Sequence, residues 1–254
     1  VKGAGQRRDH TQDDVRLSGR PMSEPRLALV VGANRGLGLG LVRELHARGW
    51  QVIGTARRPE AADALNALAA KSGGAVTVTR CDVDEPQAGA ALARHLEGRP
   101  LDLLFVNAGV SGPAHRTADQ ATAEEIGALM LTNAVAPVRL ARALLDSVRP
   151  GTGVIAFMSS VMGSITENTA GNHELYRASK AALNSLTRGL WATIGNRKLT
   201  VLSIHPGWVR TDMGGEAAAI SVDESVPGIA DILEREAGRH RHAFLDYQGR
   251  EIGW

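Results

Sequence analysis

From Arg26 onward the chain alternates short apolar runs with longer segments patterned in alanine and leucine. The short runs are nearly continuous in apolar residues, as in strands that are covered on both faces of a sheet. This alternation is typical of repeated βαβ units, so we expect an α/β fold, a doubly wound parallel sheet with helices on both faces. The expected strands are the run "RLALVVGA" from Arg26, then Gln51–Thr55, Ala75–Arg80, Leu101–Val106, Gly153–Met158 and Leu199–His205, and a short last strand in "AFLDYQGREIGW" with a turn at Gln248–Gly249.

The segments between these strands carry the apolar spacing of helices. Ser221 followed by Glu224 is a capping-box pattern, which opens a further helix towards Ala237. The other expected helices are Gly36–Arg48, Glu60–Lys71, Pro86–Glu97, Thr122–Val148 and Leu175–Ile194.

The 254 residues, 43% of them hydrophobic, are enough for one large core. Residues 26–254 are therefore expected to form a single domain. Residues 1–25 are polar, charged and glycine-rich, without the apolar stretch of a signal peptide, which predicts a disordered N-terminal extension in which Met22 is a candidate natural start. No later apolar run approaches the ~18 residues of a membrane span, so no membrane association is expected.

The charge and cysteine content argue against several kinds of partner. The 29 Lys and Arg against 27 Asp and Glu give a net charge of +2, and the basic residues are spread along the chain, which argues against a nucleic-acid groove. The single cysteine, Cys81, rules out an intrachain disulfide and fits the reducing cytoplasm. No carboxylate or thiol joins His240 and His242, so no metal is expected and the pair is interpreted as a solvated basic helix end.

The stretch "VVGANRGLGLG" sets Gly32, Gly36 and Gly38 between the first expected strand and the first expected helix. Glycines there let the backbone turn tightly and approach a pyrophosphate, whose charge is attracted by the free N–H groups at the helix start. The turn is therefore predicted to bind the phosphates of a dinucleotide. An ordinary strand-to-helix loop is the alternative.

The second expected strand ends in "VIGTARRP", which offers no carboxylate to a ribose 2′-hydroxyl and contains Arg57 and Arg58. Arg35, in the glycine turn, adds another guanidinium, and guanidinium groups suit phosphate oxygens. These residues favour NADPH over NADH as cofactor. The alternative is that the arginines are solvated side chains at a helix start.

Tyr176 and Lys180 lie four residues apart in "ELYRASKAALNSL", so a helix puts them on one face with their Cβ atoms about 5–6 Å apart. An ammonium group beside a phenol stabilises the phenolate and is expected to lower the phenol pKa from its usual ~10. A phenol tuned in this way can protonate a carbonyl oxygen as hydride arrives, or take the proton back.

The order of these motifs resembles that of the short-chain dehydrogenases/reductases, and the resemblance covers residues 26 to 254. The glycine turn is similar to the family's T-G-x-x-x-G-x-G, with Val31 in the usual place of threonine, and "RCDVDEP", "FVNAGV", "YRASK" and "HPGWVRTDM" follow. The resemblance implies a Rossmann-type domain that binds NADP(H). It implies the catalytic residues Asn133, Ser160, Tyr176 and Lys180, and the cofactor-binding residues Gly32, Asn34, Arg35, Gly36, Leu37, Gly38, Arg57, Asp82, Val83, Asn107, Ala108, Gly109, Tyr176, Lys180, Pro206, Gly207, Val209 and Thr211.

Some of these residues also have simpler interpretations. Ser160 matches the family serine that holds the substrate oxygen, while its neighbour Ser159 faces the other side of the strand. Asp82 is also read as a helix N-terminal acid, and Asn107 as an ordinary turn residue. Asn133 matches the family asparagine that interrupts the helix and holds a water connected to the lysine, and Pro137 has no N–H to bond the Asn133 carbonyl; a mid-helix asparagine without function is the alternative.

Within the family, "SSVMGSITENTAG" and "FLDYQGREIGW" resemble the C-factor/Sniffer-like carbonyl reductase branch. This implies NADPH-dependent hydride transfer between nicotinamide and a carbonyl or alcohol substrate. A nucleotide-binding signalling or regulatory protein of C-factor type, with little or no turnover, is the alternative. Substrate choice is expected to lie in the loops Met162–His173 and Thr211–Ser221, near which His115 and His173 are substrate-contact candidates or plain surface residues.

The fourth and fifth expected helices carry apolar residues on more than one face, and the family commonly pairs these helices between subunits. A homo-oligomer, dimer or tetramer, is therefore expected, with helices of a large monomer core as the alternative. The residues in question include Leu183, Leu186, Leu190 and Trp191.

Overall fold

Seven parallel strands form one sheet in the order β3-β2-β1-β4-β5-β6-β7. The computed structural model describes residues 25–113 and 117–254, so the predicted N-terminal extension, apart from Pro25, and His115 lie outside the described residues. The strands are β1 (Leu27–Val31), β2 (Gln51–Ala56), β3 (Val76–Arg80), β4 (Leu103–Val106), β5 (Val154–Met158), β6 (Thr200–His205) and β7 (His242–Asp246). The predicted strand sequence is confirmed, with small differences at the ends.

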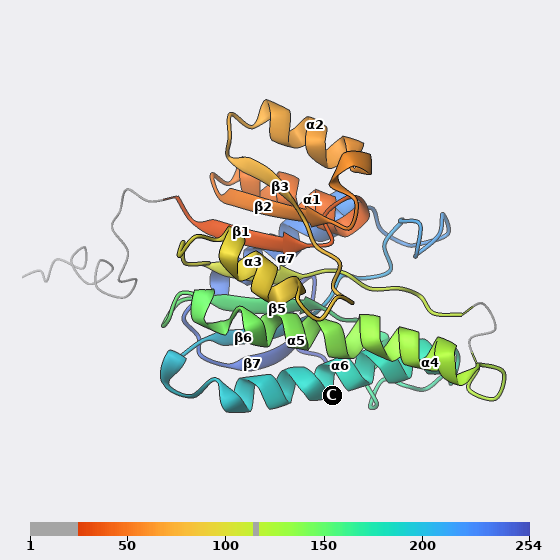
Figure 1. The fold of residues 1–254 in the computed structure, drawn as a ribbon. Coiled ribbons are helices and arrows are strands. Elements are labelled where there is room, and N and C mark those ends of the chain that lie inside the picture. Colours follow the sequence, from red (N-terminus) through yellow and green to blue (C-terminus); the bar gives the residue numbers. More distant parts are fainter. Residues whose placement is uncertain (1–24, 114–116) are drawn as a thin grey trace, which may run out of the picture.

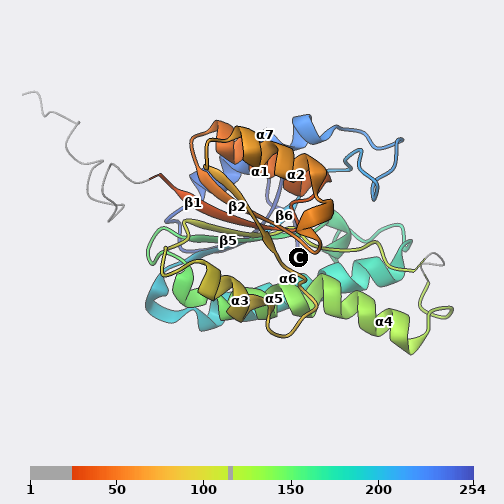
Figure 2. The same cartoon turned by 45° about the horizontal axis from the view of Figure 1, so that its top comes forward.

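Helices cover both faces of this sheet (Figures 1 and 2). One face carries α1 (Gly36–Ala47), α2 (Asp63–Lys71) and α7 (Val222–Arg235), and the other carries α3 (Ala88–His95), α4 (Ala123–Met130), α5 (Ala136–Ala143) and α6 (Glu174–Thr193). Alternate residues of a strand point to opposite faces, so Leu29 joins one buried apolar cluster with Leu183, while Val30 joins the other with Leu41. The doubly wound fold predicted from the continuous apolar runs is thereby confirmed.

The order in which strands are added to the sheet changes direction at β1. Strand β2 pairs with one edge of β1 and β4 pairs with the other. Connections leave such a point in opposite directions and open a crevice at the carboxyl ends of the strands, where open α/β sheets bind ligands. The glycine turn after β1 and the turn after β4 both lie at this edge.

The fourth helix, expected as one element over Thr122–Val148, is interrupted. A π-helical turn at Leu131–Val135 separates α4 from α5, and a 3-10 helix follows at Leu145–Ser147. Pro137 supplies no N–H to the helix ladder, and the side chain of Asn133 bonds the backbone of Val110 instead of facing solvent. The interruption at Asn133 that the family resemblance implied is therefore present, and it divides the expected range Thr122–Val148 into shorter elements.

The interpretation of His242 as part of a solvated helix end was also wrong. His242 begins strand β7, its ring stacks on Trp254 with 4.5 Å between centroids, and its Nε2 lies 3.1 Å from the Thr187 hydroxyl. Beyond β7 the chain turns back at residues 247–249, as expected, and the Ile252 N–H donates to the Phe244 carbonyl.

Within the described residues, no helix has both the length and the apolar content to span a bilayer. The capping box that was expected at the start of α7 is present: the Glu224 N–H donates to the Ser221 hydroxyl at 3.1 Å, and the Ser221 N–H donates to the Glu224 carboxylate at 2.6 Å. Both bonds satisfy amides that the first helical turn leaves without partners.

Replacing the capping hydroxyl should weaken α7 measurably. A Ser221→Ala variant is expected to lose about 1 kcal/mol of unfolding free energy, since one helix N–H loses its acceptor. Urea unfolding followed by circular dichroism measures the change. Ser185→Ala, on the exposed face of α6, is the control and should not lower stability; equal loss in both variants would contradict the capping role.

Candidate active site

The glycine turn has no room for side chains at its closest approach. A methyl group on Gly38 would lie 2.1 Å from the Gly32 carbonyl oxygen and 2.8 Å from the Asn107 amide nitrogen. Gly32 and Gly36 have φ of 84° and 55°, a region that glycine enters without steric cost. The turn leads directly into α1, whose first N–H groups point out of the helix end. This bare, tightly turned backbone fits a pyrophosphate group.

Thr55, at the end of β2, holds the glycine turn through its side chain, a contact that the sequence motifs did not reveal. The Gly32 N–H donates to the Thr55 hydroxyl at 3.1 Å, and the Ala33 N–H donates to the Thr55 carbonyl at 2.7 Å. Val31 lacks the hydroxyl that related turns carry, and Thr55 supplies one from the neighbouring strand. The only sequence signal for this contact was a threonine at the end of the second expected strand.

The three arginines predicted at the cofactor site differ in their surroundings. Arg35 forms an ion pair with Asp212, in the loop after β6, and both side chains are well exposed. Arg57 follows β2 directly and is exposed, as is Arg58. The bonds from the glycine turn to Thr55 bring the end of β2, and so Arg57, to the edge of the sheet that Arg35 occupies.

The remaining cofactor candidates gather at the same edge. The Asn107 amide donates to the Gly32 carbonyl at 2.8 Å and the Ala108 N–H to the Val31 carbonyl at 3.2 Å, so the turn after β4 lies against the glycine turn. Val83 is buried in the core after β3, and Asp82 accepts a bond from the Asp84 N–H. Asn34 is exposed. Leu37, in the first turn of α1, packs against the buried apolar cluster.

The loop after β6 closes towards the glycine turn from the other side. Pro206 is buried and its carbonyl accepts a 2.6 Å bond from Ser225, while Val209 is buried beside Ile220. Gly207 has φ 85°. A methyl group at Gly36 would meet the Thr211 side chain at 3.5 Å, so Thr211 lies at the start of α1.

Ser160 and Tyr176 meet through their side chains. Burial raises the pKa of the Tyr176 phenol to about 12, and a hydrogen bond with the Ser160 side chain offsets part of that rise. Ser160 also caps a 3-10 turn by accepting the Met162 N–H. Ser159 points elsewhere: its hydroxyl is buried and donates to Asn184 at 2.8 Å, which leaves Ser160 as the serine beside the phenol.

Lys180 lies on the same face of α6 as Tyr176, as the four-residue spacing predicted, with its Nζ 5.7 Å from the centre of the phenol ring. Complete burial lowers the Lys180 pKa to about 8, and Nζ donates to the Met158 carbonyl at 2.9 Å. The expected fall in the Tyr176 pKa is wrong for this structure. Desolvation of the phenol exceeds any favourable effect of the neighbouring amine.

Asn133 is fully buried and joins three parts of the site. Its side chain accepts the Val110 N–H and donates to the Val110 carbonyl, each at 2.8 Å, and donates to the Ser179 hydroxyl at 3.0 Å. Ser179 in turn donates to the Tyr176 carbonyl. A methyl group on Gly109 would lie 3.2 Å from the Asn133 amide oxygen and 3.4 Å from Lys180 Nζ, so these residues converge at the end of β4. Ser179, inside "YRASK", was missed because only its burial shows its role.

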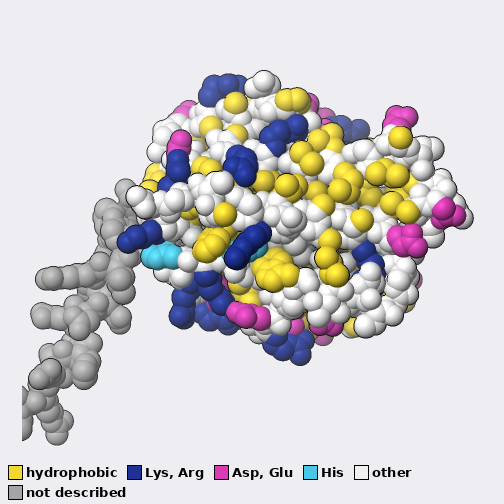
Figure 3. All heavy atoms as spheres, turned by 90° about the horizontal axis from the view of Figure 1, so that it is seen from below, with side chains coloured by type: hydrophobic (Ala, Val, Ile, Leu, Met, Phe, Trp, Pro, Cys, Tyr) yellow, Lys and Arg dark blue, Asp and Glu magenta, His cyan; other side chains and the backbone are white. Residues whose placement is uncertain are grey.

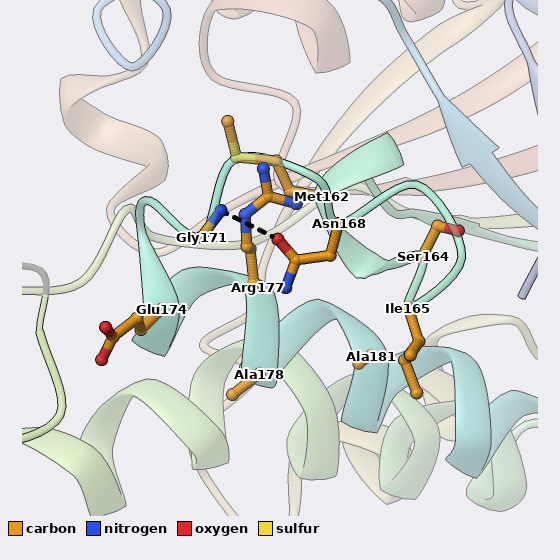
Figure 4. Close-up of a pocket in the computed structure, with 9 residues that line it drawn as sticks. All are labelled: Met162, Ser164, Ile165, Asn168, Gly171, Glu174, Arg177, Ala178 and Ala181. Atoms are coloured by element: carbon orange, nitrogen blue, oxygen red, sulfur yellow. Dashed lines mark hydrogen bonds between the residues drawn. The ribbon is translucent and has the colours of Figure 1, made fainter.

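The Met162–His173 loop separates Ser160 from Tyr176 along the chain, and a pocket lies between this loop and α6 (Figure 4). The cavity, about 230 Å³, is lined by Met162, Ser164, Ile165, Asn168 and Gly171 of the loop and by Glu174, Arg177, Ala178 and Ala181 of α6. Tyr176 does not line it, so this pocket is not the space around the phenol. His173, just before α6, has φ 56°.

Among the described residues no three His, Cys, Asp or Glu side chains are grouped closely enough to hold a metal ion.

Comparison with known proteins agrees with this arrangement. Residues 26–220 match the sequence family described as short chain dehydrogenase. The chain belongs to the short-chain dehydrogenase/reductase family, whose members are oxidoreductases that use NAD(P).

Individual relatives include proteins of several kinds. The C-signal protein of Myxococcus xanthus is 36% identical over 65% of this chain and 99% of its own length. A carbonyl reductase from Pseudomonas aeruginosa PAO1, solved in complex with NADP, is 41% identical over 91% of this chain and all of its own, with a TM-score of 0.85. The carbonyl reductase Sniffer of Drosophila melanogaster is 31% identical over 91% of this chain and all of its own, with a TM-score of 0.81. The resemblance drawn from the motifs is confirmed.

The buried Lys180 should make stability depend on pH. Its folded pKa of about 8 lies below the ordinary 10.5, so between these values the unfolded chain binds the extra proton and the free energy of unfolding rises with pH, by up to about 3 kcal/mol. Below pH 8 the cost of the buried charge is present in full. Urea unfolding between pH 7.5 and 9.5 measures this rise as the difference between the native protein and Lys180→Met, because the raised pKa of Cys81 lowers stability with pH equally in both.

A Lys180→Met variant is expected to remove the rise and to be more stable than the native protein at pH 7.5. Lys198→Met is the control, because Lys198 is exposed, and it should keep the native pH dependence. A rise that survives in Lys180→Met would show that Lys180 is not its source.

Proposed function

We propose that this protein is an NADPH-dependent carbonyl reductase that transfers hydride between nicotinamide and a small carbonyl or alcohol substrate. The observation that carries the proposal is the meeting of Ser160, Tyr176 and Lys180 beside the glycine turn, at the carboxyl edge of the sheet. A pure nucleotide-binding protein needs the turn alone. The NADP-bound carbonyl reductase from Pseudomonas supports the cofactor and the reaction class.

Tyr176 is the proposed proton donor to the substrate oxygen. With its pKa raised to about 12 by burial, the phenol is protonated throughout the neutral range, which is the state that a reduction requires of a general acid. Ser160 holds the same oxygen by a hydrogen bond, which stabilises the negative charge that develops there. Bound NADPH supplies the hydride.

Lys180 and Asn133 have supporting roles in this proposal. Lys180 Nζ is held by the Met158 carbonyl close to Gly109, where its remaining donors can bind cofactor hydroxyl groups and orient them. Asn133 fixes the turn after β4 and, through Ser179, the first turn of α6. The Asn133 carbonyl receives no bond from Pro137 and remains able to accept one from water.

The cofactor would lie along the carboxyl edge from Arg57 to Thr211. In the proposal Gly32, Gly36 and Gly38 hold the pyrophosphate, Arg35 and Arg57 the 2′-phosphate, and the residues after β3, β4 and β6 the adenine, the ribose and the carboxamide.

We extend the proposal to a cytoplasmic location, which the single cysteine supports: Cys81 is buried, and burial raises the pKa of its thiol to about 11, as expected of an unreactive thiol.

The similarity to C-signal favours a second candidate, a nucleotide-binding signalling or regulatory protein with little turnover. The two functions differ in one measurement. NADPH oxidation in the presence of a panel of aldehydes, ketones and quinones supports the reductase, whereas tight NADPH binding with no oxidation across the panel supports the regulatory protein.

We also propose that the protein is a homo-oligomer that pairs through α4, α5 and α6. Figure 3 looks onto the side of the molecule that carries these helices, and hydrophobic side chains gather there. Val135 and Leu186 are 46% and 38% exposed, which suits residues that a second subunit covers. Light scattering during size-exclusion chromatography distinguishes a dimer or tetramer from a monomer.

Removing the phenol hydroxyl tests the reaction. A Tyr176→Phe variant should bind NADPH as tightly as the native protein and lose turnover by about 100-fold or more, since the general acid is gone. The matched control is Tyr247→Phe at the only other tyrosine of the chain, which should keep full turnover. Unchanged turnover in Tyr176→Phe would overturn the proposed role.

Arg57 tests the cofactor preference. An Arg57→Ala variant is expected to bind NADPH about tenfold or more weakly, because a charged hydrogen bond to the 2′-phosphate is lost, while NADH binding stays as it was. Fluorescence titration with each nucleotide measures both affinities. Arg58→Ala, at the adjacent exposed arginine, is the control; equal weakening of NADPH and NADH by Arg57→Ala would contradict a 2′-phosphate contact.

A further inference from the structure

After β7 the chain folds back and lies against the beginning of the Met162–His173 loop. We call residues 250–254 the returning segment. Ile252 bonds the Phe244 carbonyl at 2.9 Å, and Leu245 and Glu251 pair as an antiparallel bridge. This pairing carries the last two residues of the segment to the loop. In Figures 1 and 2 the C mark stands close to α6, the helix that begins where the loop ends.

Two loop hydroxyls bind the backbone of the returning segment. Ser164 donates to the Gly253 carbonyl at 2.6 Å, and Thr166 donates to the Trp254 backbone oxygen at 2.9 Å through its hydroxyl and at 3.3 Å through its N–H. The Ser164 hydroxyl also accepts the Glu167 N–H at 3.1 Å. The first part of the loop is therefore held from outside itself.

The ring of Trp254 fixes the position of those acceptors. It stacks on His242 at 4.5 Å with 16° between the planes, and its centroid lies 5.4 Å from that of Phe244. His242 is in turn bonded to Thr187 of α6. Trp254 is 44% exposed, so one side of the ring is covered by β7. Aromatic stacking of this kind stabilises the contact beyond what the area removed from water contributes.

The far end of the loop is held separately. Arg177 donates to the Asn172 carbonyl at 2.7 Å and to its side-chain oxygen at 3.2 Å. Residues 165–172 are exposed. The middle of the loop thus spans two anchored points, and releasing one of them would multiply the conformations open to it.

We propose that Trp254 and Thr166 are positioning residues that hold the Met162–His173 loop and thereby set the affinity of the site for its substrate. The inference rests on the proposed function, because it takes the loop between Ser160 and Tyr176 as a wall of the substrate site. Neither residue touches the glycine turn, so cofactor binding does not depend on them.

Three variants test the inference. Trp254→Ala removes the stacked ring, Trp254→Phe keeps an aromatic ring there, and Thr166→Val removes the hydroxyl while keeping the branched shape. The readouts are backbone amide hydrogen exchange over residues 162–173, the affinity for NADPH, and KM and kcat separately. Thr193→Val is the control, since Thr193 lies near the other end of α6 and, among the residues that the structure describes, its hydroxyl bonds only Leu190 and Arg142.

We expect exchange in the loop to become about tenfold faster in Trp254→Ala, about 1.4 kcal/mol of lost protection, and about fivefold faster in Thr166→Val. KM should rise by similar factors, while kcat and NADPH affinity stay within about twofold. Trp254→Phe should recover most of the protection, and Thr193→Val should match the native protein.

Unchanged loop exchange in both Trp254→Ala and Thr166→Val, or weakening of NADPH binding equal to the rise in KM, would overturn the inference. The proposed function fails by a different result. If the native protein turns over no carbonyl compound but loop exchange responds to the variants as expected, the reductase assignment falls and the hold of the returning segment on the loop stands.

Discussion

The hydrogen bond from the Asn107 amide to the Gly32 carbonyl joins two turns at the point where the strand order reverses. Strands β2 and β3 extend from β1 in one direction and β4 to β7 in the other. The glycine turn is shaped by this bond and by the absence of a side chain on Gly38, whose methyl group would overlap the Gly32 carbonyl. The proposed dinucleotide site and the proposed reaction site thereby share one edge of the sheet.

The proposed reaction site is built from polar groups that would be costly to bury alone. Each has a partner: Asn133 uses three hydrogen bonds, Ser179 connects it to α6, and Lys180 Nζ is held by a strand carbonyl. The π-helical turn at Leu131–Val135 is part of the same design, since it brings the Asn133 side chain to Val110. Burial then shifts the two titrating groups in opposite senses, the phenol upwards and the amine downwards in pKa.

The features that the sequence predicted correctly are those that follow from the spacing of residues along the chain. Apolar runs identified the strands, the spacing of Tyr176 and Lys180 put them on one helix face, and the Ser221–Glu224 pattern marked the start of α7. Two features escaped because they depend on burial and on contacts between distant segments. The pKa of Tyr176 is governed by desolvation and not by its neighbour Lys180, and His242 packs against Trp254, which follows a turn.

The hydroxyl of Thr55 suggests how such a turn is best recognised. The usual motif asks for a threonine at position 31, where this chain has valine, yet the Gly32 N–H still finds a hydroxyl oxygen, offered by the adjacent strand. The requirement is met in space and not at a fixed place along the chain. A search for relatives that scores position 31 together with position 55 would therefore keep members that a linear pattern discards.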